Sequence, residues 1–345
     1  MANRNLRDTE ALIRAGLVRE TDRAALDAVG RRYATLIPPA FAALIERADD
    51  PIARQVVPHP DEVVTALHEH SDPTGDAAHS PVPGIVHRYA DRALLTPLLV
   101  CPLYCRFCFR RERVGPTGGV LDDAALERAL DWLASNPAIG EVILTGGDPL
   151  LLSARRLRRI VTALEAMPHV HTIRVHSRVP VADPERLDSA LVAALETNRA
   201  LWLVVHTNHA REFTQAARAA IRLVQRQGVP VLGQSVLLRG VNDSVAALEA
   251  LFRAMLAARI KPYYLHHLDA APGTQRFTVP IAEGRRLLED LRGRVTGLAW
   301  PTYVLDIPGG HGKVPLGPDY LDLPAGQVRD PSGTVHDLAQ QGPAG

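Results

Sequence analysis

The three cysteines of this chain lie within eight residues of one another. Cys101, Cys105 and Cys108 follow the pattern C-x3-C-x2-C, directly after an apolar stretch that is typical of a strand. Three thiolates on one tight loop can bind three irons of a [4Fe–4S] cluster, and the fourth iron then lacks a protein ligand. The pattern therefore predicts a cluster with one iron open to a small molecule.

Two other interpretations of these cysteines stay open. A structural zinc ion needs four ligands, and the chain has no fourth cysteine. His87 or His206 could complete such a site, although neither stands at a metal-ligand spacing from the cysteines. The cysteines could also have gathered by chance in a protein of a reducing compartment.

The cysteine loop resembles the signature of the radical S-adenosylmethionine (SAM) superfamily. Phe107, directly before the last cysteine, matches the aromatic residue that packs near the adenine of SAM in that superfamily. Residues 145–148, which include Gly146, Gly147 and Asp148, resemble the glycine-rich segment that receives the amino end of SAM. Glycines would permit close backbone approach there, and a carboxylate could meet the ammonium group.

Only two lysines are present, so any chemistry that needs a lysine amine has two candidates. Enzymes that use pyridoxal phosphate (PLP) hold it as a Schiff base with such an amine. Lys261 precedes a predicted strand and should lie at the opposite end of the sheet from the cysteine loop. Lys313 follows the last predicted strand and should face the same opening as the cysteines. Taken alone, Lys313 could also be a solvated lysine in a glycine-rich turn.

Three segments resemble the lysine 2,3-aminomutase family, whose members combine radical SAM chemistry with PLP. They are residues 83–92 (PGIVHRYADR), 234–243 (QSVLLRGVND) and 308–313 (PGGHGK), and the resemblance covers about residues 81–320. It implies that Lys313 forms the aldimine with PLP and that Arg88, Arg92 and Gln234 contact the phosphate side. Guanidinium groups suit a phosphate dianion. The resemblance also places His206 near SAM.

The same resemblance implies a substrate site for L-lysine. Arg110 matches the residue that binds the substrate carboxylate, and Asp269 with Asp306 matches the pair that binds the distal ammonium. Two carboxylates select a cation in a closed site, although each aspartate alone could simply cap a helix or turn. The expected reaction is an isomerisation that moves the α-amino group to the β-carbon through the PLP aldimine. It starts when an electron donor reduces the cluster.

The family features of this chain are mixed, which leaves alternatives for its function. Free-lysine aminomutases commonly carry further cysteines that bind zinc between subunits, and this chain has none. Phe109 and the pair His266–His267 look like the branch that modifies a lysine of elongation factor P, whereas Asp306 looks like the free-lysine branch. The same isomerisation could therefore serve β-lysylation of elongation factor P. A non-catalytic iron–sulfur protein is a further alternative.

The elements that must position these residues alternate between short apolar runs and longer amphipathic stretches, which predicts β–α units and a parallel sheet. Six such units fit either a partial barrel or an open doubly wound sheet, and the resemblance implies a partial (β/α)6 radical-SAM barrel over residues 86–310. The polar residues at strand ends should gather at one edge of the sheet. We expect strands at residues 93–100, 141–145, 172–176, 201–206, 230–237, 262–267 and 302–307, and helices at 122–135, 154–166, 184–197, 211–227, 245–258 and 281–295.

Two flanking regions complete the predicted organisation. Residues 1–85 should form a helical region, with helices at 23–33 and 40–47 and a loop at 71–83. Residues 311–345 should hold the loop of the PLP lysine and a closing segment with a hairpin around 330–333.

The balance of charge and hydropathy limits the partners that we expect. A net charge of +1 gives no reason to expect nucleic acid or an anionic membrane as partner, and the apolar runs are too short to cross a bilayer. The start of the chain lacks the apolar stretch of a secretory signal. We therefore expect a cytoplasmic enzyme, and assembly into a homo-oligomer stays open.

Overall fold

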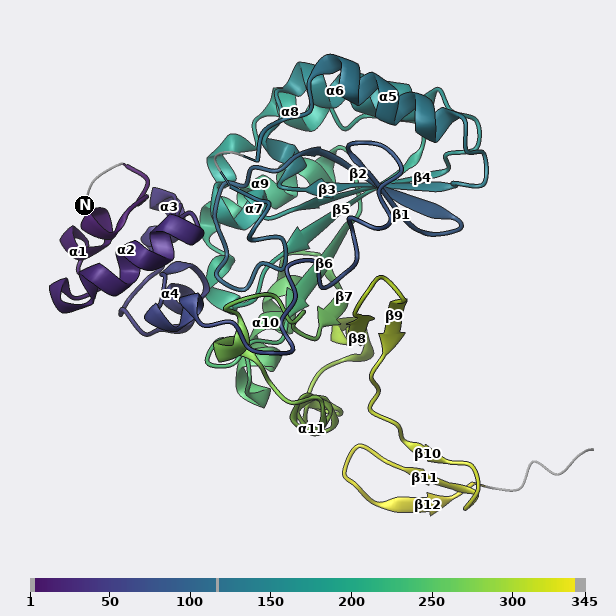
Figure 1. The fold of residues 1–345 in the computed structure, drawn as a ribbon. Helices are drawn as coiled ribbons and strands as arrows, with labels where there is room; N and C mark the ends of the chain where they lie inside the picture. The colour runs from purple at the N-terminus through teal and green to yellow at the C-terminus, as the bar shows by residue number, and fades with distance from the viewer. Residues whose placement is uncertain (1–3, 116–117, 339–345) are drawn as a thin grey trace, which may run out of the picture.

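The computed structural model describes residues 4–115 and 118–338, and within them the main sheet has nine strands in chain order (Figure 1). Each of β2 to β7 pairs in parallel with the next strand along the chain, while β1 and β9 pair antiparallel with β2 and β8. The strands are β1 (Ile85–Tyr89), β2 (Arg92–Leu98), β3 (Glu141–Gly146), β4 (Thr172–Ser177), β5 (Ala200–His206), β6 (Val231–Val236), β7 (Lys261–His266), β8 (Thr302–Ile307) and β9 (Gly312–Pro315).

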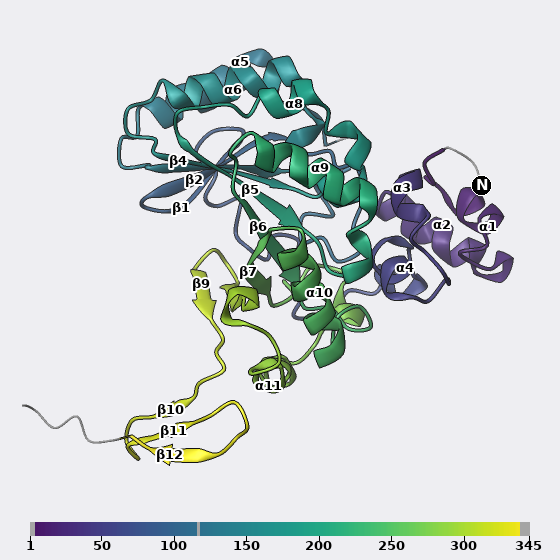
Figure 2. The ribbon, with the colours of Figure 1, turned by 180° about the vertical axis from the view of Figure 1, so that it is seen from behind.

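Helices connect the parallel strands and cover the outer face of the curved sheet (Figures 1 and 2). They are α5 (Asp123–Ala134), α6 (Ala154–Glu165), α7 (Val179–Ala182), α8 (Ser189–Ala193), α9 (Gln215–Arg226), α10 (Val245–Ala257) and α11 (Ile281–Leu291), with short 3-10 helices η3 (Pro149–Leu151), η4 (Pro184–Arg186), η5 (Ala210–Glu212), η6 (Gln275–Phe277) and η7 (Gly297–Ala299). In the described residues β1 and β9 do not pair with each other, so the barrel stays open. The predicted partial barrel is thus confirmed, and the seven predicted strands correspond to β2–β8.

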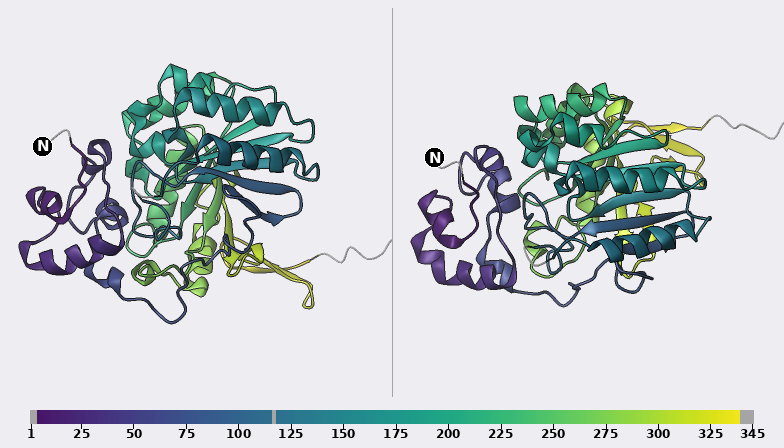
Figure 3. Two further views of the ribbon diagram at one scale, coloured as in Figure 1. Left: turned by 45° about the horizontal axis from the view of Figure 1, so that its top comes forward. Right: turned by 90° about the horizontal axis from the view of Figure 1, so that it is seen from above.

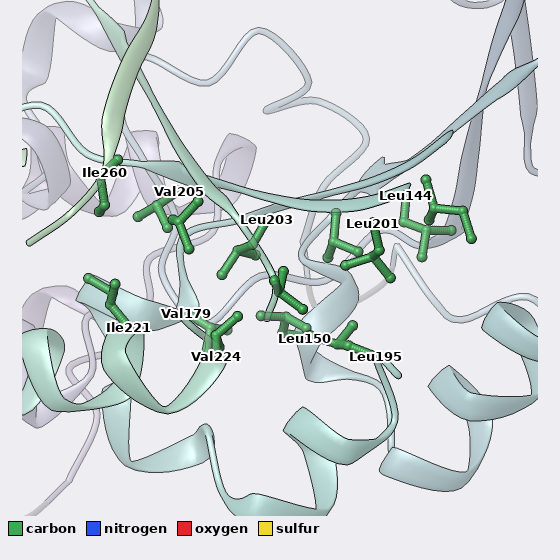
Figure 4. Close-up of a cluster of buried hydrophobic side chains, with 14 of the residues drawn as sticks. Leu144, Leu150, Val179, Leu195, Leu201, Leu203, Val205, Ile221, Val224 and Ile260 are labelled. Carbon is green, nitrogen blue, oxygen red and sulfur yellow. The ribbon is translucent and has the colours of Figure 1, made fainter. Parts of the chain in front are cut away.

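The barrel strands bury alternate side chains against the helices. In β4 and β6 every second residue is buried and the residues between them are half-buried, as expected for a strand whose two faces meet different surroundings. Figure 4 shows the buried face, where Leu201 and Leu203 of β5 lie above Ile221 and Val224 of α9. Burial of such side chains is the main favourable term in folding. The other face of the strands remains available to line a cavity.

The N-terminal helices lie to one side of the barrel, as both views of Figure 3 show. They pack on it through an apolar cluster in which Phe41 and Ile52 meet Leu103 of the cysteine loop and Ala182 of α7. Residues 71–83 contain no helix or strand, as expected. The helices are α1 (Thr9–Arg14), α2 (Arg23–Arg32), α3 (Pro39–Ala42) and α4 (Pro51–Val56), with 3-10 helices η1 (Glu20–Asp22) and η2 (Pro60–Val63).

Four predicted helices differ from those of the structure by several residues, and capping residues explain two of them. One of the other two is the helix expected at 281–295, which already ends at Leu291. The helix expected at 184–197 is wrong as a single element, because Asp188 accepts a hydrogen bond from the Leu191 amide and starts the separate helix α8. Thr214 caps α9 in the same way, so that helix begins at Gln215 and not at 211. The helix expected at 40–47 is reduced to α3, which ends at Ala42.

The C-terminal part of the chain continues from β9 into a small separate sheet of β10 (Leu321–Asp322), β11 (Gln327–Arg329) and β12 (Val335–Asp337). This sheet lies apart from the barrel strands in Figures 1 and 2, and Arg329 of β11 pairs with Glu289 of α11. β11 and β12 are antiparallel, which confirms the predicted hairpin. Residues 339–345 of the predicted closing segment lie outside the described residues, and the division of the chain at residues 85 and 310 stays a prediction. Within the described part of the chain, none of the helices combines the length and the apolar character needed to span a membrane.

Candidate active site

A cavity of about 680 Å³ lies inside the barrel, and every site residue predicted from the sequence lines it. Lys261, which was not predicted to belong to the site, does not line the cavity. It lies at the start of β7, and its Nζ donates to the carbonyl oxygens of Pro262 and Trp300. Lys313 therefore is the lysine that shares the cavity with the cysteines. The predicted residues gathered here are Cys101, Cys105, Cys108, Phe107, Arg110, Gly146, Gly147, Asp148, Arg88, Arg92, His206, Gln234, Asp269, Asp306 and Lys313.

The three cysteine thiols are free and half-buried in the cavity wall. Burial raises the pKa of Cys101 well above its ordinary value and that of Cys108 to about 11, so binding of iron must displace protons. In the described residues no three His, Cys, Asp or Glu side chains converge on a single metal ion. A four-iron cluster does not require such convergence, because each cysteine binds a different iron. The three thiols on this loop match the three protein ligands of such a cluster.

The glycine segment after β3 fits tightly against the strand that leads into the cysteine loop. A Cβ added at Gly147 would lie 2.2 Å from the carbonyl oxygen of Val100, directly before the first cysteine. The Asp148 amide donates to the same oxygen at 2.9 Å. Glycine is therefore required here for close approach to the chain itself, whereas the sequence suggested close approach to a ligand.

The carboxylate of Asp148 is buried and joins the ends of β3 and β4. It accepts hydrogen bonds from the hydroxyl of Ser177 at 2.8 Å and from the amide of Arg178 at 2.7 Å, and also from the amides of Leu150 and Val179. Burial raises the pKa of Asp148 in spite of these donors. An ammonium group would have to share oxygens that already have partners in the chain.

An aromatic surface lies beside the cysteine loop. The rings of Phe107 and His206 are stacked at 5.8 Å with 15° between their planes, and Phe277 packs edge-on against Phe107 at 5.9 Å. Burial, followed by the charge of Arg178, lowers the pKa of His206 well below its ordinary value, so the imidazole is neutral. Flat rings that pack in this way offer a surface for a planar base.

Lys313 lies on the strand β9 and not in a loop, which differs from the expectation. The register of β8 and β9 places Lys313 directly opposite Asp306, and the two side chains form an ion pair. Gly310 in the connecting turn has a φ of +88°, and a Cβ there would lie 2.6 Å from the ring of His79. The glycine therefore lets the turn before Lys313 pack closely on the loop at 71–83.

The two arginines expected at the phosphate have different partners. Arg88 donates to Asp306 at 3.3 Å and to the carbonyl oxygen of Thr74 at 2.9 Å, and its side chain is 8% exposed. Arg92 stacks on the ring of Tyr89 at 3.6 Å. Asp306 is thus shared between the guanidinium of Arg88 and the ammonium of Lys313 in this structure.

Arg110 is held by a residue that the sequence analysis missed. Its Nε donates to the carboxylate of Asp76 at 2.8 Å, and Asp76 is buried in the loop at 71–83. Burial opposes ionisation of Asp76, but the charge of Arg110 outweighs it and keeps the pKa of Asp76 below its ordinary value. No sequence signal connects the two residues, because they lie in separate irregular segments. Other cavity-lining residues that were missed include Tyr89, Arg174, Arg178, Trp202, Tyr263 and Tyr264.

Asp269 and Asp306 line the same cavity, close enough for the charge of Asp306 to act on Asp269. Burial, followed by the negative charge of Asp306, raises the pKa of Asp269 to about 7. The folded protein therefore binds this proton more tightly than the unfolded chain does, and the contribution of Asp269 to stability falls by about 1.4 kcal/mol per pH unit between roughly pH 4 and 7. Two carboxylates held together in this way indicate a site built for a cation.

Asp269→Asn is therefore expected to stabilise the cofactor-free protein by a few kcal/mol near pH 8. The gain should shrink as the pH is lowered toward about 5, because the native carboxyl is then protonated and neutral like the amide. Urea unfolding at several pH values measures this change. Asp319→Asn is the control, since Asp319 is exposed and pairs with Arg285 at the surface. An equal effect of Asp269→Asn at every pH would contradict the raised pKa.

The open parallel barrel and the three-cysteine loop define a radical SAM enzyme. The family model for the radical SAM superfamily matches residues 95–251, and the model for lysine-2,3-aminomutase matches residues 288–327. The L-lysine 2,3-aminomutase of Acetoanaerobium sticklandii is 39% identical over 83% of this chain and 69% of the relative. That of Clostridium subterminale is 38% identical over 83% of this chain and 69% of the relative. That of Escherichia coli is 38% identical over 82% of this chain and 83% of the relative. The chain belongs to the lysine 2,3-aminomutase family.

Membership of this family confirms that the protein is an isomerase with a [4Fe–4S] cluster, SAM and PLP as cofactors. The described residues fit these groups. Three thiols lie on one loop, and the amine of Lys313 lies in the same cavity. The radical SAM aminomutase class predicted from the sequence is therefore confirmed.

Proposed function

We propose that this protein converts free L-lysine to β-lysine by moving the α-amino group to the β-carbon. One observation carries the proposal: a single cavity contains the cysteine loop, the amine of Lys313, the guanidinium of Arg110 and the carboxylates of Asp269 and Asp306. An amino acid with a second ammonium group needs a guanidinium at one end and carboxylates at the other.

The proposal assigns the cofactors to separate parts of the cavity wall. The cysteines would hold the cluster, the surface formed by Phe107 and His206 would receive the adenine of SAM, and Gly146, Gly147 and Asp148 would border its amino end. Lys313 would hold PLP covalently, with Arg88, Arg92 and Gln234 at its phosphate side. When bound, the cluster and SAM supply the radical and PLP carries the migrating nitrogen.

The protein's own groups would orient the substrate and select it. Asp76 fixes the guanidinium of Arg110, which would bind the α-carboxylate. Asp306 now holds the ammonium of Lys313, and attachment of PLP to Lys313 would remove that ammonium. Asp306 would then keep its contact with Arg88, and its carboxylate and that of Asp269 would border the distal ammonium of lysine. Fixed contacts at both ends would hold one hydrogen of the β-carbon toward the radical.

Protein reconstituted anaerobically with iron, sulfide and PLP is expected to convert L-lysine to β-lysine over many turnovers when SAM and a reductant are added. Chromatography would follow the product over time. The amide of L-lysine is a matched control, because it lacks the carboxylate that Arg110 would bind, and it should react at least about tenfold more slowly. Cleavage of SAM without formation of β-lysine would contradict the proposal. Lysine-bearing elongation factor P would then be the substrate to test.

A further inference from the structure

Arg178 is a buried cation in direct contact with the cysteine loop. It lies between β4 and α7, and 6% of its surface is exposed. Its Nη1 donates to the Sγ of Cys105 at 2.6 Å. A guanidinium keeps its charge at every pH at which proteins normally work. One fixed positive charge therefore lies beside one of the three cysteines.

Side chains from separate parts of the fold hold this guanidinium in place. The Nη2 of Arg178 donates to the side-chain oxygen of Gln55 on α4 at 2.6 Å and to the carboxylate of Glu212 at 3.2 Å. The rings of Phe41 and Phe107 lie 5.1 and 5.7 Å from the guanidinium carbon. The side chain of Glu212 is itself fully buried. Arg178 cannot leave the cysteine loop without breaking contacts to several elements.

Reduction of a [4Fe–4S] cluster adds one electron, and hence one negative charge, close to this guanidinium. A nearby cation and an N–H···S hydrogen bond both favour the reduced cluster over the oxidised one. We infer that Arg178 is a positioning residue that acts through Cys105 to make the cluster easier to reduce by a one-electron donor. This inference rests on the proposed cluster site. Arg178 would thus take part in generating the radical, although it lies outside the cysteine motif.

A purely structural role for Arg178 would have a different signature. The contact with Gln55 also ties the N-terminal helices to the barrel, so loss of Arg178 should lower stability whether or not the cluster is affected. Stability and activity therefore do not separate the two roles. The reduction potential does, because it depends on the charge and the hydrogen bonds near the sulfurs.

The test is a potentiometric titration of protein reconstituted with iron, sulfide and PLP, followed by the electron paramagnetic resonance signal of the reduced cluster. Arg178→Gln removes the charge and keeps an amide donor. It is expected to lower the equilibrium constant for one-electron reduction about tenfold, which corresponds to a potential about 59 mV more negative. Arg178→Lys keeps the charge and should cause less than half of this shift. Glu212→Gln removes a negative charge nearby and should shift the potential in the opposite direction.

Arg211→Gln is the matched control. Arg211 also joins the N-terminal helices to the region of Glu212, through ion pairs with Glu46 and Asp50, and its variant should keep the wild-type potential. Fully loaded Arg178→Gln protein with the wild-type potential would overturn the inference and leave the cluster site standing. Wild-type protein that binds no iron and sulfide would overturn both. If Arg178→Gln loses the cluster, the other two variants decide. The inference would be overturned if Arg178→Lys and Glu212→Gln both had the wild-type potential, or if both shifted it in the same direction.

Discussion

Lys313→Ala is expected to abolish covalent binding of PLP and to lower the formation of β-lysine by at least about a thousandfold. Lys313 is the lysine that lines the cavity, and its Nζ forms an ion pair with Asp306 on the neighbouring strand. Borohydride reduction followed by mass spectrometry would locate the adduct. The wild-type protein should carry PLP on the peptide that contains Lys313, and the variant should carry none.

Lys261 offers a matched control for this variant, since it is the only other lysine of the chain. Its ammonium donates to backbone carbonyl oxygens at the start of β7, away from the cavity. Lys261→Arg keeps a donor there and should retain both the PLP adduct and the activity. An adduct on Lys261 in the wild-type protein, or full activity of Lys313→Ala, would contradict the assignment of Lys313.

The parallel part of the barrel was predictable because each of the strands β2–β8 has a local signal, whereas β1 and β9 were not predicted. The apolar runs that became β2–β8 are short and separated by amphipathic stretches, and parallel strands need such crossovers. The residues at the carboxyl ends of these strands, such as His206, Asp269 and Asp306, then had to meet in one cavity, whatever the details of packing. Their grouping therefore followed from the order of strands alone.

The residues that orient the site were not predictable, because their contacts join segments far apart in the sequence. Asp76 lies in an irregular loop, and nothing in its neighbourhood indicates that it holds Arg110. Arg178 looks like an ordinary residue after a strand, yet it contacts Cys105. Even Lys313 was expected in a loop, because a strand as short as β9 carries too few residues to show an alternating pattern. Tertiary contacts decided all of these positions.

Cys108→Ala and Cys105→Ala are expected to remove the cluster and to reduce cleavage of SAM to background, a loss of at least about a thousandfold. Each variant leaves two thiolates for a cluster that needs three protein ligands in this loop. The Cys108 variant has the simpler interpretation, because Cys105 also accepts a hydrogen bond from Arg178. Iron and sulfide content, the visible absorption of the cluster and the yield of 5′-deoxyadenosine measure the loss.

The cysteine and lysine variants together separate the two cofactor sites. Cys108 and Lys313 line the same cavity, but one lies on the loop after β2 and the other on β9, so neither substitution should damage the other site. Cys108→Ala should therefore keep PLP bound to Lys313, and Lys313→Ala should keep the cluster and the cleavage of SAM. Loss of both cofactors in either variant would indicate general unfolding and would contradict the separate sites. Retention of a full cluster in Cys108→Ala would contradict the three-cysteine assignment directly.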